Sequence, residues 1–216
     1  MNWLYDKNMN RKQHILYTVL FFFLVFIIFS FSVKSKVLDS FDLNTTIALQ
    51  SYIPRNFDTF LSFFSLLGSF EITCIILMIV LLLRKRKLSY LIFLVLFAVN
   101  FIELLGKTFL EHPGPPIRFF RYTLPFYFPS SHIQPGSSYP SGHSLRMAFV
   151  LIISLFAIHL SKKISLRIRY ILYVLVSFIS VIMFFSRISL GEHWTSDVIG
   201  GMLLGISSGL FSVLLL

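Results

Sequence analysis

Six long, mostly apolar runs dominate the chain. They cover about residues 15–33, 59–83, 88–110, 144–160, 168–185 and 198–216, and charged or turn-forming residues separate them. A helix needs roughly 20 apolar residues to cross the hydrocarbon core of a bilayer, because each residue adds about 1.5 Å. The pattern therefore predicts an all-α integral membrane protein in which six transmembrane helices form one bundle and residues 1–216 form a single domain.

Composition supports this class. Hydrophobic residues make up 56% of the 216 residues and charged residues only 13%, which does not suit a water-soluble surface. Cys74 is the single cysteine, so an internal disulfide framework and a zinc site built on several thiolates are both excluded. Nothing in the sequence indicates a cofactor.

Basic residues predict which ends of the helices face the cytoplasm. Three segments near the ends of the apolar runs carry eleven of them: Lys7, Arg11, Lys12, Arg84, Lys85, Arg86, Lys87, Lys162, Lys163, Arg167 and Arg169. Asp6 is the one acidic residue in these segments, so their excess equals the formal net charge of +10. Short loops rich in Lys and Arg stay on the cytoplasmic side. Both termini are therefore predicted to be cytoplasmic, and no nucleic-acid partner is needed to explain the charge.

Two segments on the outward side are more than simple turns. Residues 34–58 predict an amphipathic helix on the outer membrane interface, with a loose connection as the alternative. Its apolar residues follow a mostly helical spacing: Val37, Leu38, Phe41, Leu43, Ile47, Ala48 and Tyr52. Residues 111–140 are rich in Pro, Gly, Ser and aromatic residues and are too long for a mere connector. We expect this second segment to cover or build a site.

Polar residues gather at the outward ends of four predicted helices. They are Lys107 at the end of the third helix, Ser141, Gly142 and His143 at the start of the fourth, Arg187 at the end of the fifth, and His193 and Asp197 at the start of the sixth. Polar groups at such positions are costly in a membrane and are usually functional. Two cations, two imidazoles and a carboxylate on one face are suited to binding an anion and moving protons.

The two helix starts have complementary chemistry. Ser141 is a good N-cap, and Gly142 lets a ligand approach the free backbone amides, which bind phosphate together with the positive end of the helix dipole. His193 and Asp197 are four residues apart and face the same way on a helix. The carboxylate can then hold one ring nitrogen protonated and leave the other as a nucleophile.

The remaining polar groups complete this arrangement. Lys107 and Arg187 would neutralise the oxygens of a transferring phosphoryl group, a reaction in which positioning and electrostatics dominate. His143 is the natural proton donor to the leaving oxygen. Glu103 lies one turn before Lys107, so we expect an ion pair that positions Lys107 rather than a second acid for the reaction.

These residues resemble the three-part signature of the type-2 phosphatidic acid phosphatases. The second part of the signature matches residues 140–143, which read Pro-Ser-Gly-His, and the third matches residues 186–197, which read Ser-Arg-x5-His-x3-Asp, with Lys107 upstream. The superfamily also includes bacterial lipid pyrophosphate phosphatases, glucose-6-phosphatase and vanadium haloperoxidases. Six membrane helices over essentially the whole chain fit the same family.

The resemblance implies a role for each matching residue. His193 would be the nucleophile that forms a phosphohistidine, Asp197 would orient it, and His143 would protonate the leaving alcohol or phosphate. The residues implied to bind the phosphoryl group are Lys107, Arg187, Ser141 and Gly142. The resemblance implies no metal.

The first part of the signature departs from the family pattern. The family has an arginine seven residues after the lysine, but Gly114 stands at that distance from Lys107. One lost phosphate contact costs about 10²-fold to 10³-fold in rate. Arg146, one turn inside the fourth predicted helix, is the first candidate to replace the arginine, and Arg118 or Arg121 in the outer segment is the second. The alternative is that nothing replaces it.

Other interpretations of the histidines are weaker. A purely structural role for His143 and His193 is the alternative, but their spacing together with an Asp and two cations favours catalysis. His112 and His132, in the outer segment, would be metal ligands if they joined the other two, but no His-x-x-x-His spacing or carboxylate pair supports such a site.

The sequence thus predicts a lipid phosphatase that acts at the outer face of a cytoplasmic (inner) membrane. Its partners are the membrane and a phospholipid or isoprenoid phosphate substrate, for which undecaprenyl pyrophosphate, phosphatidylglycerol phosphate and phosphatidate are the family's usual bacterial examples. The alternatives are a lipid phosphotransferase that uses the same intermediate and a catalytically silent lipid-binding or flipping protein. The oligomeric state is left open.

Overall fold

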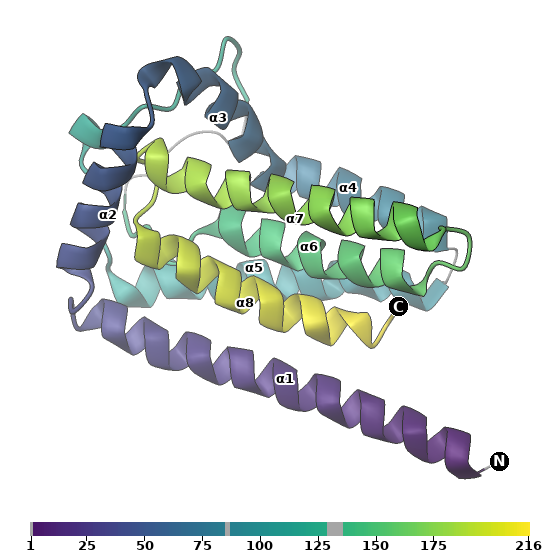
Figure 1. Ribbon diagram of the computed structural model, residues 1–216. Coiled ribbons are helices and arrows are strands. Elements are labelled where there is room, and N and C mark those ends of the chain that lie inside the picture. Colours follow the sequence, from purple (N-terminus) through teal and green to yellow (C-terminus); the bar gives the residue numbers. More distant parts are fainter. Residues whose placement is uncertain (1, 85–86, 129–135) are drawn as a thin grey trace.

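The computed structural model describes residues 2–84, 87–128 and 136–216, and these form an all-helical bundle (Figure 1). The α-helices are α1 (Asn2–Lys34), α2 (Asp39–Tyr52), α3 (Asp58–Ser65), α4 (Phe70–Arg84), α5 (Ile92–Leu110), α6 (Gly142–Leu160), α7 (Leu166–Ser189) and α8 (Thr195–Val213). The short 3-10 helices are η1 (Arg55–Phe57), η2 (Leu66–Gly68), η3 (Lys87–Leu91) and η4 (Ile117–Phe119). The predicted all-α membrane class is confirmed.

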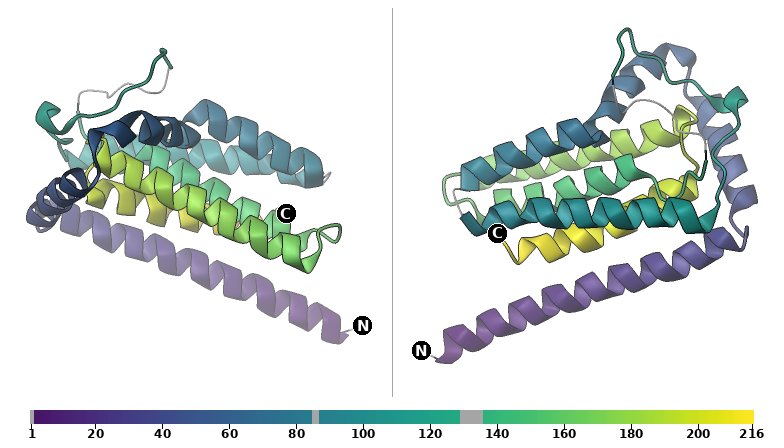
Figure 2. Two further views of the ribbon diagram at one scale, coloured as in Figure 1. Left: turned by 45° about the horizontal axis from the view of Figure 1, so that its top comes forward. Right: turned by 180° about the vertical axis from the view of Figure 1, so that it is seen from behind.

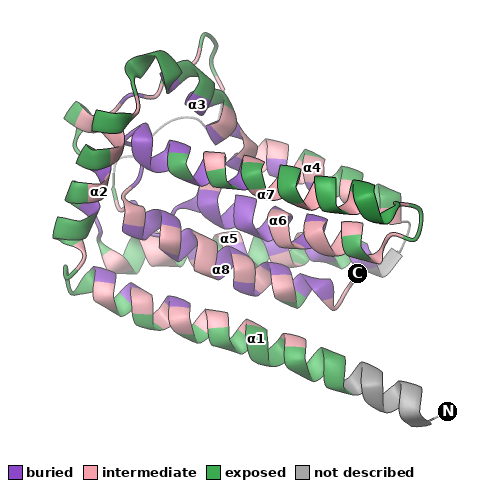
Figure 3. Cartoon of the chain, viewed as in Figure 1, coloured by how far each residue is buried: buried purple, intermediate pink, exposed green. Residues whose placement is uncertain are grey.

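Five described helices, α1, α5, α6, α7 and α8, have segments long and apolar enough to cross a membrane. Their outer faces carry exposed apolar side chains such as Leu20, Phe31 and Val174, whereas buried residues concentrate along α6 and α8 (Figure 3). Exposed apolar faces around a buried core are the surface that lipid requires. The chain is therefore a multi-pass membrane protein.

The predicted second membrane helix, residues 59–83, is bent. Residues 55–68 and α4 pass the length and composition test only as a pair, and they meet at an angle of 59°. Ser69 is extended between them, with φ −64° and ψ 152°, and its Oγ accepts a hydrogen bond from Ile72 N at 3.4 Å. A Cβ added at Gly68 would lie 2.6 Å from the His143 carbonyl oxygen. The break therefore lets the backbone at Gly68 pack directly on α6.

Helix α2 lies across one end of the bundle, as the two further views also show (Figure 2). Asp42 accepts hydrogen bonds from Ser196 N at 2.7 Å and from Ser196 Oγ at 2.6 Å. Gln50 Nε2 donates to Phe119 O at 2.6 Å and to Ser189 O at 2.9 Å. The helix predicted within residues 34–58 thus exists and is tied to the ends of α7 and α8, while its place at the membrane interface stays a prediction.

Glycines on α8 bring it close to α6. A Cβ added at Gly201 would lie 2.3 Å from Ser141 O, and one added at Gly205 would lie 2.2 Å from Leu145 O. Small residues at such contacts let two membrane helices approach through their backbones. The close packing holds together the starts of α6 and α8, where the predicted site residues lie.

Both termini and the connection from α6 to α7 lie at the end of the bundle opposite α2 (Figure 1). The described basic residues of the predicted cytoplasmic segments lie in this region as well, while Lys85 and Arg86 fall outside the described residues. The predicted grouping of these segments at one end matches the observed arrangement. Which side of a membrane that end faces stays a prediction.

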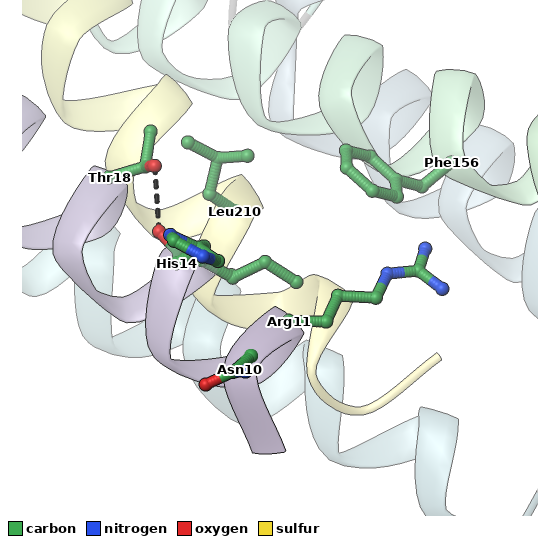
Figure 4. Close-up of a pocket in the computed structure, with 7 residues that line it drawn as sticks. Asn10, Arg11, His14, Thr18, Phe156 and Leu210 are labelled. Carbon is green, nitrogen blue, oxygen red and sulfur yellow. Dashed lines mark hydrogen bonds between the residues drawn. The ribbon is translucent and has the colours of Figure 1, made fainter. Parts of the chain in front are cut away.

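A pocket of about 470 Å³ lies between α1 and the pair formed by α6 and α8 (Figure 4). Arg11, His14 and Thr18 line it from α1, and Phe156 and Leu210 line it from the other two helices. None of the predicted site residues lines this pocket, so it is not the candidate site.

Candidate active site

The candidate active site lies at the α2 end of the bundle, where the starts of α6 and α8 meet. Ser141 N donates a hydrogen bond to Asp197 O at 3.0 Å, which joins the two starts directly. Ser141 also caps α6, because its Oγ accepts from Ser144 N at 3.4 Å. A Cβ added at Gly142 would lie 2.2 Å from Glu103 Oε1 on α5. Glycine therefore leaves room for the α5 carboxylate beside the start of α6, and a larger residue would displace that carboxylate.

His193 and Asp197 form the predicted pair. His193 Nδ1 lies 3.3 Å from Asp197 Oδ2, and the same oxygen accepts a hydrogen bond from Trp194 N at 2.9 Å. Burial and the positive charges of Arg187 and Lys107 lower the pKa of His193 to about 4, against the opposing effect of Asp197. The imidazole is therefore neutral near pH 7, with its Nε2 lone pair free.

A third imidazole shares the same carboxylate. His112 Nδ1 lies 2.9 Å from Asp197 Oδ1. Burial disfavours the charged form of His112, but the hydrogen bond and charge of Asp197, with smaller contributions from Asp42 and Asp39, outweigh it and raise the pKa. Asp197 is thus held between two histidines, one of which, His112, precedes it by 85 residues in the sequence.

Glu103 holds both Lys107 and Arg146. Its Oε1 lies 2.7 Å from Lys107 Nζ, and its Oε2 lies 3.4 Å from Arg146 Nη1. The predicted ion pair between Glu103 and Lys107 is therefore present. Two cations that the sequence places on different helices meet at this one buried carboxylate.

Arg146 is surrounded by protein acceptors. Its Nε donates to the Gly68 carbonyl oxygen at 2.8 Å, and its Nη1 donates to Asn100 Oδ1 at 2.9 Å. Its Nη2 lies 3.4 Å from His143 Nδ1. Because a guanidinium only donates, Nδ1 of His143 is the acceptor and the ring proton lies on Nε2. Arg146 therefore lies beside the predicted proton donor; that it also replaces the missing arginine stays a prediction.

Arg187 is buried and partly paired. Its Nη1 lies 2.6 Å from Glu192 Oε2 and also donates to Ser65 Oγ. Burial raises the pKa of Glu192, and the charge of Arg187 and the hydrogen bond from Ser65 oppose that shift. Among the described residues, Arg187 Nε has no hydrogen-bond partner. A buried donor without a partner is costly, and an anion in the site would satisfy it.

The two outer-segment arginines are placed differently. Arg121 is buried and pairs with Asp58, with Nη2 2.8 Å from Oδ1. Its Nη2 also donates to Ile53 O at 3.0 Å. Arg118 is exposed, and its guanidinium carbon lies 5.0 Å from the centre of the Phe119 ring. Arg121 thus holds the outer segment against α3, and a phosphate contact by Arg118 stays a prediction.

A model of the PAP2 superfamily matches residues 84–216. The chain belongs to the PAP2 superfamily. The match covers more than half of the sequence and includes Lys107 and the whole stretch from Ser141 to Asp197. The resemblance that these residues indicated is therefore confirmed.

Two solved structures share the fold of this chain. The first transmembrane PAP2 type phosphatidylglycerolphosphate phosphatase from Bacillus subtilis superposes with a TM-score of 0.72 at 23% identity, over 91% of this chain and 94% of that chain. LpxE from Aquifex aeolicus superposes with a TM-score of 0.60 at 23% identity, over 80% of this chain and 94% of that chain. No curated protein sequence matches the chain.

Several neighbours of the PAP2 motifs are not indicated by the motifs themselves. Gly68 and Ser69 form a pair of the kind that breaks helices, so that break had a visible signal. Glu192 directly precedes His193, but nothing in the sequence indicates that it pairs with Arg187. From the sequence, His112 is interpreted only as an alternative metal ligand with His132, which falls outside the described residues. Within the described ranges, no group of three His, Cys, Asp or Glu side chains is arranged to hold a metal ion.

Proposed function

We propose that this protein is a membrane lipid phosphatase that hydrolyses a phosphate monoester or pyrophosphate of a lipid through a phosphohistidine at His193. The pair formed by His193 and Asp197 carries the proposal, because it presents a neutral, buried imidazole with one nitrogen bound to a carboxylate. The unpaired Nε of Arg187 supports it, since a buried guanidinium edge beside this pair is suited to a phosphoryl oxygen.

The reaction has two steps that conserve atoms and charge. In the first, His143 takes up a second ring proton as the anionic substrate binds, His193 Nε2 attacks phosphorus, and the bond to the leaving oxygen breaks while His143 Nε2 gives a proton to that oxygen and returns to the neutral ring. In the second, water attacks the phosphohistidine, His143 takes a proton from the water, and inorganic phosphate leaves. Lys107, Arg187 and the backbone amides at the start of α6 stabilise the oxygens in both steps.

The same arrangement supports a lipid substrate and an outward-facing site. The site lies at the end of the bundle opposite the basic segments, which favour the cytoplasmic side. Exposed apolar side chains on α2 and α3, such as Phe41, Ile47 and Phe60, surround this end and suit a membrane interface. The solved relative from Bacillus subtilis is named for phosphatidylglycerolphosphate, so that lipid joins undecaprenyl pyrophosphate and phosphatidate among the proposed substrates.

Phosphate release tests the proposed function. We expect purified protein in detergent to release inorganic phosphate from phosphatidylglycerol phosphate, phosphatidate or farnesyl pyrophosphate, and to act far less on glycerol 3-phosphate. Release should persist with a chelator, because each proposed step uses only groups of the protein and water. Phosphate that appears only on an added acceptor lipid would indicate a phosphotransferase, and no turnover of the three lipids would indicate the silent alternative.

Arg146 is proposed to orient His143 and to supply the positive charge missing at Gly114. We expect Arg146→Ala to lower kcat about 100-fold, measured as phosphate release. A Cβ at Gly114 would meet Ser138 Cβ at an ordinary 3.5 Å, so the first atom of a side chain has room there. The double variant with Gly114→Arg should recover part of the lost rate, and unchanged turnover in Arg146→Ala would rule out both roles.

A further inference from the structure

The carboxylate of Asp197 has two imidazole partners, and the proposed mechanism uses only one. His112 Nδ1 lies 2.9 Å from Oδ1, a shorter contact than the 3.3 Å between His193 Nδ1 and Oδ2. Asp197 is fully buried and His112 is 8% exposed. A buried carboxylate is oriented by all of its donors together, so His112 helps to fix the plane in which Asp197 faces His193.

The chain holds His112 in place through its backbone. Helix α5 ends at Leu110, and its C-cap Glu111 has the left-handed φ of 45°, which turns the chain out of the helix just before His112. His112 N donates to Ser137 Oγ at 3.0 Å, and His112 O accepts from Ser138 N at 2.7 Å. Pro113 forms a β-bridge with Ser137. These contacts join His112 to the segment that leads directly into the start of α6.

Several charged and titratable groups face His112. Asp197 contacts it from α8, and Asp42 and Asp39 act on it from α2. The Tyr139 ring lies edge-on with its centre 6.4 Å from that of His112. This acidic surrounding favours an imidazolium at His112, whereas the cations near His193 favour a neutral ring there. The pKa of His112 is therefore shifted upward and that of His193 downward, although both rings contact the same carboxylate.

We infer that His112 is a positioning residue for the phosphohistidine step: it anchors Asp197 in the orientation that His193 needs, and its charge keeps the carboxylate from drawing a proton onto His193. This inference rests on the proposed function. His112 stands five residues after Lys107 and two before Gly114. It therefore supplies a cation from the same segment in which the signature's arginine is absent, directed at Asp197.

Two substitutions separate anchoring from charge. We expect His112→Ala to lower kcat about 10-fold to 100-fold, the loss for one hydrogen bond to a charged group, with KM nearly unchanged. His112→Asn keeps a donor at the place of Nδ1 and should restore kcat to within about threefold. Neither alanine nor asparagine carries a positive charge. In both variants we therefore expect the pKa of His193, about 4 in the wild type, and with it the acid limb of the pH profile of kcat, to rise by about 1 unit.

A chemical titration provides the readout that does not need turnover. Diethyl pyrocarbonate modifies neutral imidazole, so the pH dependence of His193 modification, read by peptide mass spectrometry, reports its protonation in every variant. His159 is exposed on the far part of α6 and serves as the internal reference. An unchanged kcat in His112→Ala, an unmoved His193 titration, or a failure of His112→Asn to restore kcat would overturn the inference. Wild-type protein without turnover would refute the proposed function, while the titration would still decide the role of His112.

Discussion

His193→Ala should lower kcat for phosphate release by about 10⁴-fold to 10⁶-fold, the range measured when the nucleophile of a hydrolase is removed. The loss is expected to be this large because the neighbouring imidazole, His143, has its Nδ1 against Arg146 and its Nε2 directed to proton transfer, so it does not replace the nucleophile. Rapid quenching in alkali should trap a phosphorylated protein from wild type and none from the variant.

A matched control separates this loss from misfolding. His159→Ala changes an imidazole at the other end of the molecule, whose Nδ1 lies 3.3 Å from Tyr173 Oη, and should leave both kcat and the trapped phosphoprotein at wild-type levels. Phosphate found on a residue other than His193, or a phosphoprotein that persists in His193→Ala, would disprove the assigned nucleophile.

Arg187→Ala should lower kcat by about 10²-fold to 10³-fold, because it removes a donor that stabilises the phosphoryl oxygens. It should also destabilise the protein by about 3–5 kcal/mol, since Glu192 would stay buried without its partner. In the wild-type protein, Glu192 Oε2 lies 2.6 Å from Arg187 Nη1. Kinetics and thermal unfolding in detergent measure the two effects separately.

The double variant Arg187→Met with Glu192→Gln distinguishes these two effects. It removes the charge and keeps similar volumes, so we expect most of the stability to return while the rate stays low. Ser65 Oγ also keeps a polar partner in the glutamine, because it donates to Glu192 Oε2 at 3.2 Å in the wild type. Recovery of the rate in the double variant would show that Arg187 has no contact with the phosphoryl group.

The sequence predicted the membrane class well because its signals are averages over many residues. An apolar run of about 20 residues in a bilayer forms a membrane-spanning helix in nearly all cases. The segments rich in Lys and Arg then indicate which helix ends lie on the same side of the membrane. The positions of Ser141, His193 and Asp197 at helix starts also follow from local preferences for caps and short spacings. These features depend on neighbours within about one helical turn.

The partners across the site could not be predicted in the same way. The contacts between His112 and Asp197 and between Arg187 and Ser65 join residues far apart in the chain, and they depend on how the connecting segments fold. Arg121 illustrates the limit, since its residue type suggested a phosphate ligand whereas its position gives it Asp58. A basic residue in an outer segment can pair with any acidic group within reach, and the tertiary packing determines which one it pairs with.

The break in the helix at Gly68 also helps the protein to hold the positive charge of Arg146 inside a membrane-spanning segment. In a straight helix, the Gly68 carbonyl would bond to the amide of residue 72, but Ile72 N bonds to Ser69 Oγ instead and leaves that oxygen to Arg146. An arginine inside a membrane costs from about 2.5 to about 17 kcal/mol when it lacks such partners. A chain with an unbroken helix here would still cross the membrane, but it would lose one of the neutral ligands that make a guanidinium tolerable at this depth.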